Sequence, residues 1–280
     1  MCGTIPFNRV AIVRDNSHLA HNSHITFMRE TSITITSGGQ QVFGVLHIPA
    51  RRSKAPLVIL VHGWSGNLLG TWNAFFVRTA RAFARRGFAV FRFDFRGSGN
   101  SNGVFEQQNH SSMLLDLKNV VSQVSTHEGI DARRIALIGH SQGGYLSILH
   151  ASRDRRIRAL ILWMGRTADI KDFWSKTTFD EIRRKGFTIW YDHKVIKKYA
   201  DDSMKYHSEP ALRKIKVPIG MIYGEADGVV PPSEGLRVMR YAKGPKRLNI
   251  LKDLDHDFSG EKPKVMVIAT TLGWLRRWLR

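Results

Sequence analysis

The feature that most constrains the fold is an alternation of short apolar runs with segments of helical periodicity, which begins near residue 57 and continues to the C-terminus. Each apolar run is continuous, as in strands that are covered on both faces. The expected strands are 57–61, 88–93, 135–138, 158–164, 217–223 and 248–251. The expected helices are 72–86, 111–126, 142–152, 233–242 and 263–279. This alternation predicts an α/β fold with a mostly parallel sheet and helices on both faces.

Two parts of the chain depart from the alternation. Residues 1–24 show no clear period, and we expect them to form a loose N-terminal arm ahead of a domain that spans 25–280. That domain begins with β-type patterning over residues 25–50, which predicts antiparallel strands. Residues 166–216 are rich in aromatic and basic side chains and are too long for an ordinary connection between strands. We expect them to form a small helical cap over the carboxyl edge of the sheet.

The strongest chemical signal is the sequence Gly-His-Ser-Gln-Gly-Gly at 139–144, which follows an expected strand and opens an expected helix. This is the context that a G-x-S-x-G nucleophile elbow requires. A tight turn from strand to helix strains the serine backbone, and glycines on either side leave space for neighbouring structure. The turn raises Ser141 above the sheet and directs the N–H of Gln142 toward a developing oxyanion. We therefore predict Ser141 as a nucleophile.

A serine nucleophile needs a base, and the base needs a carboxylate that orients it. Of the histidines after Ser141, only His256 lies in a loop beyond the last expected strand, where it can reach the carboxyl edge of the sheet. The acid is expected in the turn after the preceding strand, where Glu225 and Asp227 are the candidates. We favour Asp227, because a shorter carboxylate placed further into the turn suits the geometry of this motif.

The loop after the strand at 57–61 reads His-Gly-Trp-Ser-Gly and supplies a candidate second oxyanion donor. Gly63 lets the backbone turn, and the N–H of Trp64 is then the expected partner of the N–H of Gln142. We interpret His62 as a buried residue that supports this loop, and not as a base.

Several motifs occur in the order of one large family: His-Gly at 62–63, Phe-Asp-Phe-Arg-Gly-Ser-Gly-Asn-Ser at 93–101, the elbow, Gly224 with Asp227, and Asp-His at 255–256. Together they resemble the α/β-hydrolase superfamily from about residue 25 to the C-terminus. Their forms are particularly similar to the cinnamoyl/feruloyl esterase group of bacterial carboxylesterases. The family roles that this resemblance implies are a triad of Ser141, Asp227 and His256, oxyanion donors at Trp64 and Gln142, and loop-tying roles for Asp94 and Arg96.

The resemblance implies a serine carboxylesterase that hydrolyses small or aryl esters, of the cinnamoyl or feruloyl type, through an acyl-enzyme intermediate. Its partner is then a small-molecule ester. Thioesterases, lipase-like enzymes and acylaminoacyl-type peptidases share the triad, so they remain alternatives that the pocket decides. A non-catalytic binding module with the same fold is an alternative from another class. The Met-Cys-Gly start resembles that of N-terminal-nucleophile amidotransferases, but nothing downstream supports their fold.

Composition narrows the expected partners and compartment. Lysine and arginine number 43 against 23 acidic residues, giving a formal net charge of +20. The basic residues are scattered in short clusters with no nucleic-acid-binding motif, so we interpret them as a solvated surface and expect no nucleic-acid partner. No apolar run reaches the roughly 18 residues of a membrane-spanning helix. No signal peptide is evident, and the single cysteine, Cys2, fits a reducing compartment, so we expect a cytoplasmic protein. No metal or cofactor is implied, and a homodimer is left open.

Overall fold

The computed structural model describes residues 28–50, 54–71 and 73–280, so the expected N-terminal arm at 1–24 lies outside the described residues. The described chain forms an eight-stranded sheet in the order β1-β2-β4-β3-β5-β6-β9-β10. The strands are β1 Met28–Ser37, β2 Gln40–Pro49, β3 Ala55–Val61, β4 Ala89–Phe93, β5 Ile130–His140, β6 Ile157–Trp163, β9 Ile219–Gly224 and β10 Lys246–Leu251. Pairing is antiparallel between β1 and β2 and between β2 and β4, and parallel from there to β10. The predicted mostly parallel sheet is confirmed.

The two antiparallel strands at the edge form a tight hairpin. Ser37 pairs with Gln40, and the two residues between them are Gly38 and Gly39, with φ of 53° and 76°. Two-residue hairpin turns require such positive φ angles, which glycine adopts without strain. The strand β1 is continuous through the polar residues at 29–32. The reason is that β1 lies at the sheet edge with much of its length exposed, where polar side chains face solvent.

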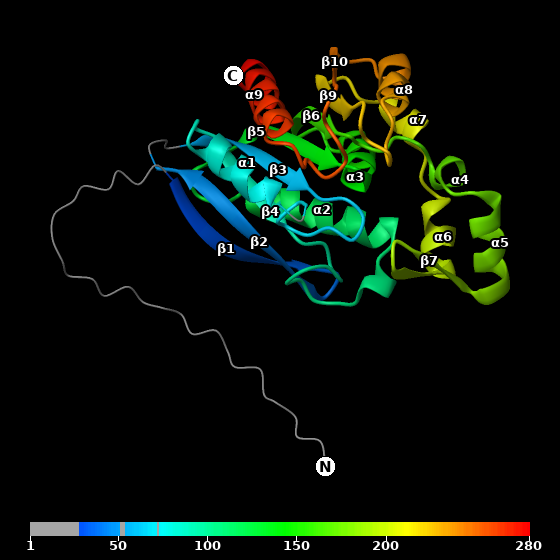
Figure 1. The fold of residues 1–280 in the computed structure, drawn as a ribbon. Coiled ribbons are helices and arrows are strands. Elements are labelled where there is room, and N and C mark those ends of the chain that lie inside the picture. Colours follow the sequence, from blue (N-terminus) through cyan, green and yellow to red (C-terminus); the bar gives the residue numbers. More distant parts are fainter. Residues whose placement is uncertain (1–27, 51–53, 72) are drawn as a thin grey trace.

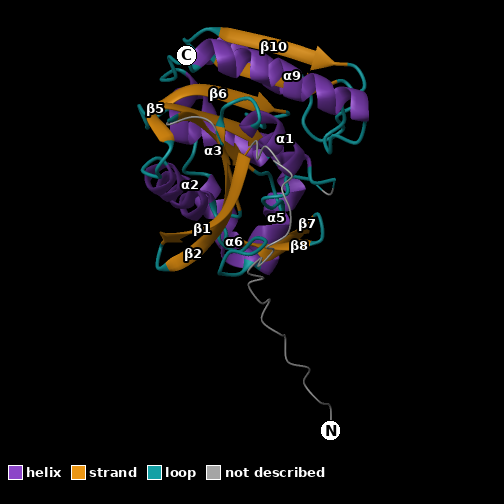
Figure 2. Ribbon diagram, turned by 90° about the vertical axis from the view of Figure 1, so that its left-hand side faces the viewer, coloured by secondary structure: helices purple, strands orange, loops and turns teal. Residues whose placement is uncertain are grey.

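Helices cover both faces of the sheet, as predicted (Figure 2). On one face α1 (Phe75–Ala84) and α9 (Glu261–Trp278) pack against each other. On the other face α2 (His110–Val124) packs against α3 (Gln142–Ala151), and α8 (Ser233–Tyr241) lies along β10. A short 3-10 helix, η1, spans Phe105–Gln107. Among the helices of the described residues, none has the length and apolar character needed to cross a membrane.

Most of the chain between β6 and β9 forms a lobe at one end of the sheet, and its last helix packs back against α3 (Figure 1). We call this whole stretch the inserted segment. Its elements are α4 Ile170–Phe173, α5 Lys176–Lys185, β7 Phe187–Trp190, β8 His193–Ile196, α6 Lys197–Ser203 and α7 Ser208–Leu212. The lobe has its own apolar cluster, in which Trp174 and Tyr199 are the largest buried side chains, and Trp64 from the loop after β3 packs against it. The inserted segment is therefore packed directly onto the loop that follows β3.

The β7–β8 hairpin departs from the purely helical content expected for this stretch. Its turn consists of Tyr191 and Asp192, whose φ angles are 45° and 61°. The turn therefore has the positive φ at both positions that a two-residue hairpin needs, but it lacks the Asn-Gly or Gly-containing sequence that usually marks one. The sequence carried no turn signal that would have revealed these strands.

Candidate active site

Ser141 occupies a sharp turn between β5 and α3, with φ of 53° and ψ of −123°. Positive φ is costly for a residue with a side chain and persists only where the surrounding structure imposes it. A Cβ on Gly143 would lie 2.2 Å from the carbonyl oxygen of Val61, and one on Gly139 would lie 2.4 Å from that of Gly143. Strand and helix backbones thus approach more closely than any side chain allows. The structure forms the strand–turn–helix elbow that the glycine pattern predicts.

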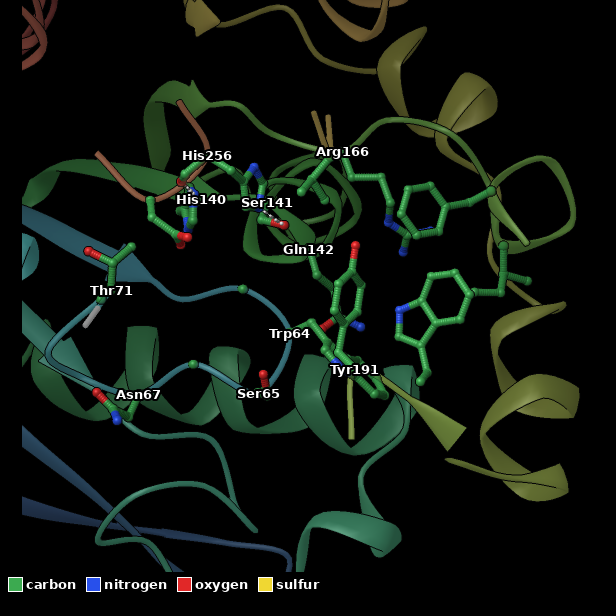
Figure 3. A pocket seen from close by; sticks show the side chains of 18 of the residues that line it. Trp64, Ser65, Asn67, Thr71, His140, Ser141, Gln142, Arg166, Tyr191 and His256 are labelled. Carbon is green, nitrogen blue, oxygen red and sulfur yellow. Dashed lines mark hydrogen bonds between the residues drawn. The ribbon is translucent and has the colours of Figure 1, made fainter. Parts of the chain in front are cut away.

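The structure brings Ser141, His256 and Asp227 together in a hydrogen-bonded row (Figure 3 shows the first two). His256 Nε2 lies 3.1 Å from Ser141 Oγ, and His256 Nδ1 lies 2.8 Å from Asp227 Oδ2. With its Nδ1–H donating to the carboxylate, the imidazole has Nε2 available to accept the serine proton. This is the geometry of a serine–histidine–acid relay.

Asp227 is oriented by its own turn. Its side chain is fully buried, and Oδ1 accepts the backbone N–H groups of Val229 and Val230 at 2.7 and 2.8 Å. These bonds hold the carboxylate so that Oδ2 faces His256. The rival Glu225 is exposed on the same turn, and in the described chain His256 bonds to Asp227 and not to Glu225. The structure therefore places the residue favoured from sequence beside the imidazole.

The loops that carry the acid and the histidine meet at Gly224, the last residue of β9. A Cβ there would lie 1.7 Å from the carbonyl oxygen of Leu254, in the loop after β10. Because β9 and β10 are parallel neighbours, their carboxyl ends lie side by side, and the glycine lets one loop rest on the other. This contact holds the loop that carries Asp227 against the loop that carries His256.

His140 is a supporting residue that sequence reasoning did not single out. It lies buried at the end of β5, and its Nε2 donates to the backbone carbonyl of His256 at 3.0 Å. Burial holds the pKa of His140 well below its usual value, and the neighbouring His256 lowers that pKa further. His140 is therefore a neutral donor that anchors the His256 backbone. Its position directly before Ser141 was the one available signal.

The loop after β3 lies against Ser141. A Cβ on Gly63 would be 2.8 Å from Ser141 Cβ, so only glycine permits this approach. Trp64 and Gln142 both line the cavity at Ser141, and in the described part of the chain neither backbone N–H donates to another group. Two such N–H groups beside a serine hydroxyl have the arrangement that an oxyanion hole requires.

A buried polar cluster joins the elbow to the inserted segment. The Gln142 side chain donates through Nε2 to the hydroxyl of Tyr199 on α6, and His110 Nε2 on α2 lies 3.3 Å from both groups. Burial raises the pKa of Tyr199 to about 12 and lowers the pKa of His110 to about 3, so both are neutral near pH 7. The cluster ties three helices together directly beneath the pocket. Gln142 was predicted only for its backbone N–H, and its side-chain contacts with Tyr199 and His110 were not predicted, because nothing in the sequence pairs these distant positions.

His62 supports the loop after β3, as interpreted from sequence. It is buried, its Nδ1 donates to the carbonyl of Gly63 at 2.9 Å, and its Nε2 accepts the N–H of Phe95 at 3.1 Å. Burial lowers the pKa of His62. Asp94 accepts the N–H of Asn100 at 2.7 Å, and Arg96 pairs with Asp116 at 2.6 Å. These contacts hold the loop conformations around the site and leave His256 as the histidine that reaches Ser141.

A cavity of about 440 Å³ opens over Ser141 (Figure 3). One wall is the loop after β3, and another is the inserted segment. Its aromatic lining consists of Trp64, Phe173, Trp174, Trp190, Tyr191 and Tyr199. Within the described residues, no cluster of His, Cys, Asp and Glu has the arrangement of a metal site. The arrangement is an apolar cavity of small-molecule size with a hydrogen-bonded serine in its wall.

Comparisons with known proteins agree with this geometry. A model of the prolyl oligopeptidase family matches residues 73–280. An uncharacterized 31.7 kDa protein from the traX-finO intergenic region of Escherichia coli is 25% identical over 251 residues, covering 75% of this chain and 86% of that protein. The acylamino-acid-releasing enzyme of Mus musculus is 27% identical over 254 residues, 81% of this chain and 32% of that enzyme. A solved structure, Est1E from Butyrivibrio proteoclasticus with ferulic acid bound, has a TM-score of 0.73 at 22% identity, covering 88% of this chain and 98% of that chain.

Proposed function

The chain belongs to the prolyl oligopeptidase family and is a serine hydrolase with the α/β-hydrolase fold, and from this premise we propose that it is a carboxylesterase acting on small or aryl esters. The observation that carries the proposal is the contact of Ser141 Oγ with His256 Nε2 in the wall of an aromatic cavity. A hydroxyl bonded to an oriented imidazole is an activated nucleophile, and the cavity is of the size that encloses a small ester.

In the proposed reaction, His256 Nε2 removes the proton of Ser141 as Oγ attacks the ester carbonyl carbon. Asp227 stabilises the imidazolium that forms, and the N–H groups of Trp64 and Gln142 donate to the oxyanion. A donor of this kind contributes roughly 100-fold or more to the rate. The alcohol leaves with the proton from His256. A water molecule, deprotonated by His256, then cleaves the acyl-enzyme and returns Ser141 to its starting state.

The aryl part of the proposal rests on the aromatic walls. In our proposal the inserted segment acts as a cap that covers the acyl or alcohol group, since Phe173, Trp174 and Trp190 face the cavity from it. Aromatic rings stack on planar groups with a gain beyond simple burial. Est1E, which shares the fold, is a protein with ferulic acid bound, and we carry this substrate class over from it.

The test compares hydrolysis of p-nitrophenyl acetate and methyl ferulate by the wild type and by Ser141→Ala. We expect the substitution to lower kcat by at least about 10³-fold, because the attacking oxygen is removed. The ratio between the two substrates separates a general esterase from an aryl esterase. Full activity in Ser141→Ala would exclude the serine mechanism, and a wild type inert on both esters would exclude the esterase proposal.

A peptidase of the acylaminoacyl type is the second candidate, favoured by the family and by the mouse relative that releases acylamino acids. The chain spans 32% of that relative, so its activity does not transfer directly. Hydrolysis of N-acetyl-alanine p-nitroanilide discriminates between the two. An amide rate that approaches the ester rate would favour the peptidase, because amides are intrinsically much harder to cleave than activated esters.

A further inference from the structure

The cavity wall contains an arginine that the proposed reaction does not use. Arg166 follows β6, and its backbone N–H donates to the carbonyl of Ser141 at 2.9 Å, so its side chain starts beside the nucleophile. The residue is 4% exposed and lines the cavity (Figure 3). Among the described residues that line this cavity, Arg166 is the one lysine or arginine.

The guanidinium of Arg166 has no acidic partner among the described residues. Its single hydrogen bond there runs from Nη1 to the carbonyl of Ala168, at 3.1 Å. The acid three residues further on, Asp169, is bonded instead to Tyr145, His207 and Ser208. Within the described chain, Arg166 is therefore a buried residue whose guanidinium makes one hydrogen bond, to a backbone carbonyl.

Aromatic rings hold the guanidinium in place without neutralising its charge. The guanidinium carbon lies 4.4 Å from the ring centroid of Tyr145 and 5.0 Å from that of Phe173. Such stacking orients the planar fork, which matches a carboxylate in a bidentate manner. A buried charge is costly to a protein unless something pairs with it. The cavity is open to ligand, so a substrate that carries an anionic group could pair with this guanidinium.

We propose that Arg166 binds a carboxylate on the substrate, so that the preferred substrates are esters of acids with a second, ionised carboxyl group. This inference rests on the proposed esterase function and specifies its substrate class. A single arginine matches the single charge of a carboxylate. The net charge of +20 also raises the local concentration of anions near the protein, which favours an acidic substrate over a neutral one.

Two p-nitrophenyl esters that differ at one position test the proposal. In mono-p-nitrophenyl glutarate a carboxylate stands where p-nitrophenyl valerate has its terminal methyl group, and uncatalysed hydrolysis is subtracted for both. We expect the wild type to prefer the glutarate, and Arg166→Met to lower kcat/KM for it by roughly 10- to 100-fold, the worth of a charged hydrogen bond. The valerate rate should stay within about threefold. Arg166→Lys should retain part of the preference, because it keeps the charge but not the fork.

Arg153→Met is the matched control. Arg153 also lies over a tyrosine ring, 5.9 Å from the centroid of Tyr206, but it is exposed and outside the cavity. Arg153→Met removes the same charge from the molecule and should change neither the glutarate rate nor the valerate rate. If Arg166→Met lowered both rates equally, Arg166 would be a structural clamp and the proposal would be wrong. A wild type that prefers the valerate would also overturn it.

Direct binding separates failure of this proposal from failure of the esterase function. Ser141→Ala is titrated with monoethyl glutarate and with ethyl valerate, and binding is followed by calorimetry. We expect the glutarate to bind at least about tenfold more tightly, and the difference to disappear when Arg166→Met is added. Equal binding of the two would overturn the carboxylate site even in an active esterase. If the glutarate bound more tightly but the wild type hydrolysed neither p-nitrophenyl ester, the carboxylate site would stand and the esterase proposal would be wrong. If Arg166→Met does not fold, Arg166→Lys serves as the readout in both assays.

Discussion

Asp227 makes two hydrogen bonds in addition to the one that it makes with His256. One oxygen contacts His256, and the other accepts two backbone N–H groups within its own turn. The carboxylate therefore does two things. It orders the turn after β9, and it selects the tautomer of His256 that leaves Nε2 able to accept a proton.

We predict that Asp227→Asn lowers kcat on p-nitrophenyl acetate by about 10³- to 10⁴-fold, because an amide in place of Oδ2 favours the wrong imidazole tautomer. The melting temperature should change little if the amide oxygen takes the place of Oδ1. Glu225→Gln is the control, since that carboxylate is exposed on the same turn and should leave kcat unchanged. Loss of activity in Glu225→Gln with retention in Asp227→Asn would show that the acid had been assigned wrongly.

At the scale of elements, the decisive contact is the close approach of α3 to β3. Gly143 opens the helix that follows Ser141, and the backbone oxygens of Val61 and His62 lie where its Cβ would be. Both are main-chain atoms, one in the last residue of a fully buried strand and one in the buried residue that follows it, so they cannot move aside as a flexible side chain can. The position of the whole helix, and with it the N–H of Gln142, depends on this absence of a side chain.

We predict that Gly143→Ala lowers the free energy of unfolding by about 3 kcal/mol or more, as overpacking against immobile backbone does in the most severe cases. Gly273→Ala is a matched control in α9, where a new Cβ would meet nothing within 4 Å. There alanine should raise stability by about 0.5–1 kcal/mol through helix propensity. Urea unfolding of the two variants gives the comparison. Similar effects of the two substitutions would contradict the packing argument.

At the scale of the whole molecule, several histidines are buried as neutral groups. Burial lowers the pKa of His47 to about 4 and that of His110 to about 3, and it lowers the pKa values of His62 and His140 as well. In the unfolded chain each would titrate near 6.5. Below that pH the unfolded state binds more protons than the folded state, so stability falls as the pH falls.

We predict that the free energy of unfolding is highest above pH 6.5 and decreases as the pH falls toward 4, by up to about 1.4 kcal/mol per pH unit for each buried histidine. Carboxylates with lowered pKa values, such as Asp169, act mainly below this window. His110→Gln should reduce the dependence of the free energy of unfolding on pH by the contribution of one buried histidine, up to about 1.4 kcal/mol per pH unit. We expect this reduction whatever the substitution does to stability at pH 7.5. Urea unfolding at several pH values measures the slope, and an unchanged slope in His110→Gln would count against the neutral, buried state of that residue.

Much of the molecule could be predicted from local sequence. The order of strands and helices follows from apolar runs and helical periodicity, which depend on neighbouring residues alone. The elbow at Ser141 could be predicted for the same reason, since its glycines and flanking elements lie within a few residues. His256 was separated from the other histidines by its place after the last strand. The choice between Glu225 and Asp227 was closer, because both follow the same strand.

Only the tertiary structure could decide what depends on distant residues meeting. The β7–β8 hairpin lacks a turn signal, and its strands are held by packing within the inserted segment. His140 meets the backbone of His256, 116 positions away, and Gln142 meets Tyr199, 57 positions away. The sequence by itself determined the order of the elements outside the inserted segment and predicted the residues of the proposed relay, since apolar runs, helical periodicity and short motifs are local features of the chain. The cavity and the burial of Arg166 away from the acidic side chains of the described residues were decided by the fold, because burial and neighbouring charge are properties of a packed environment.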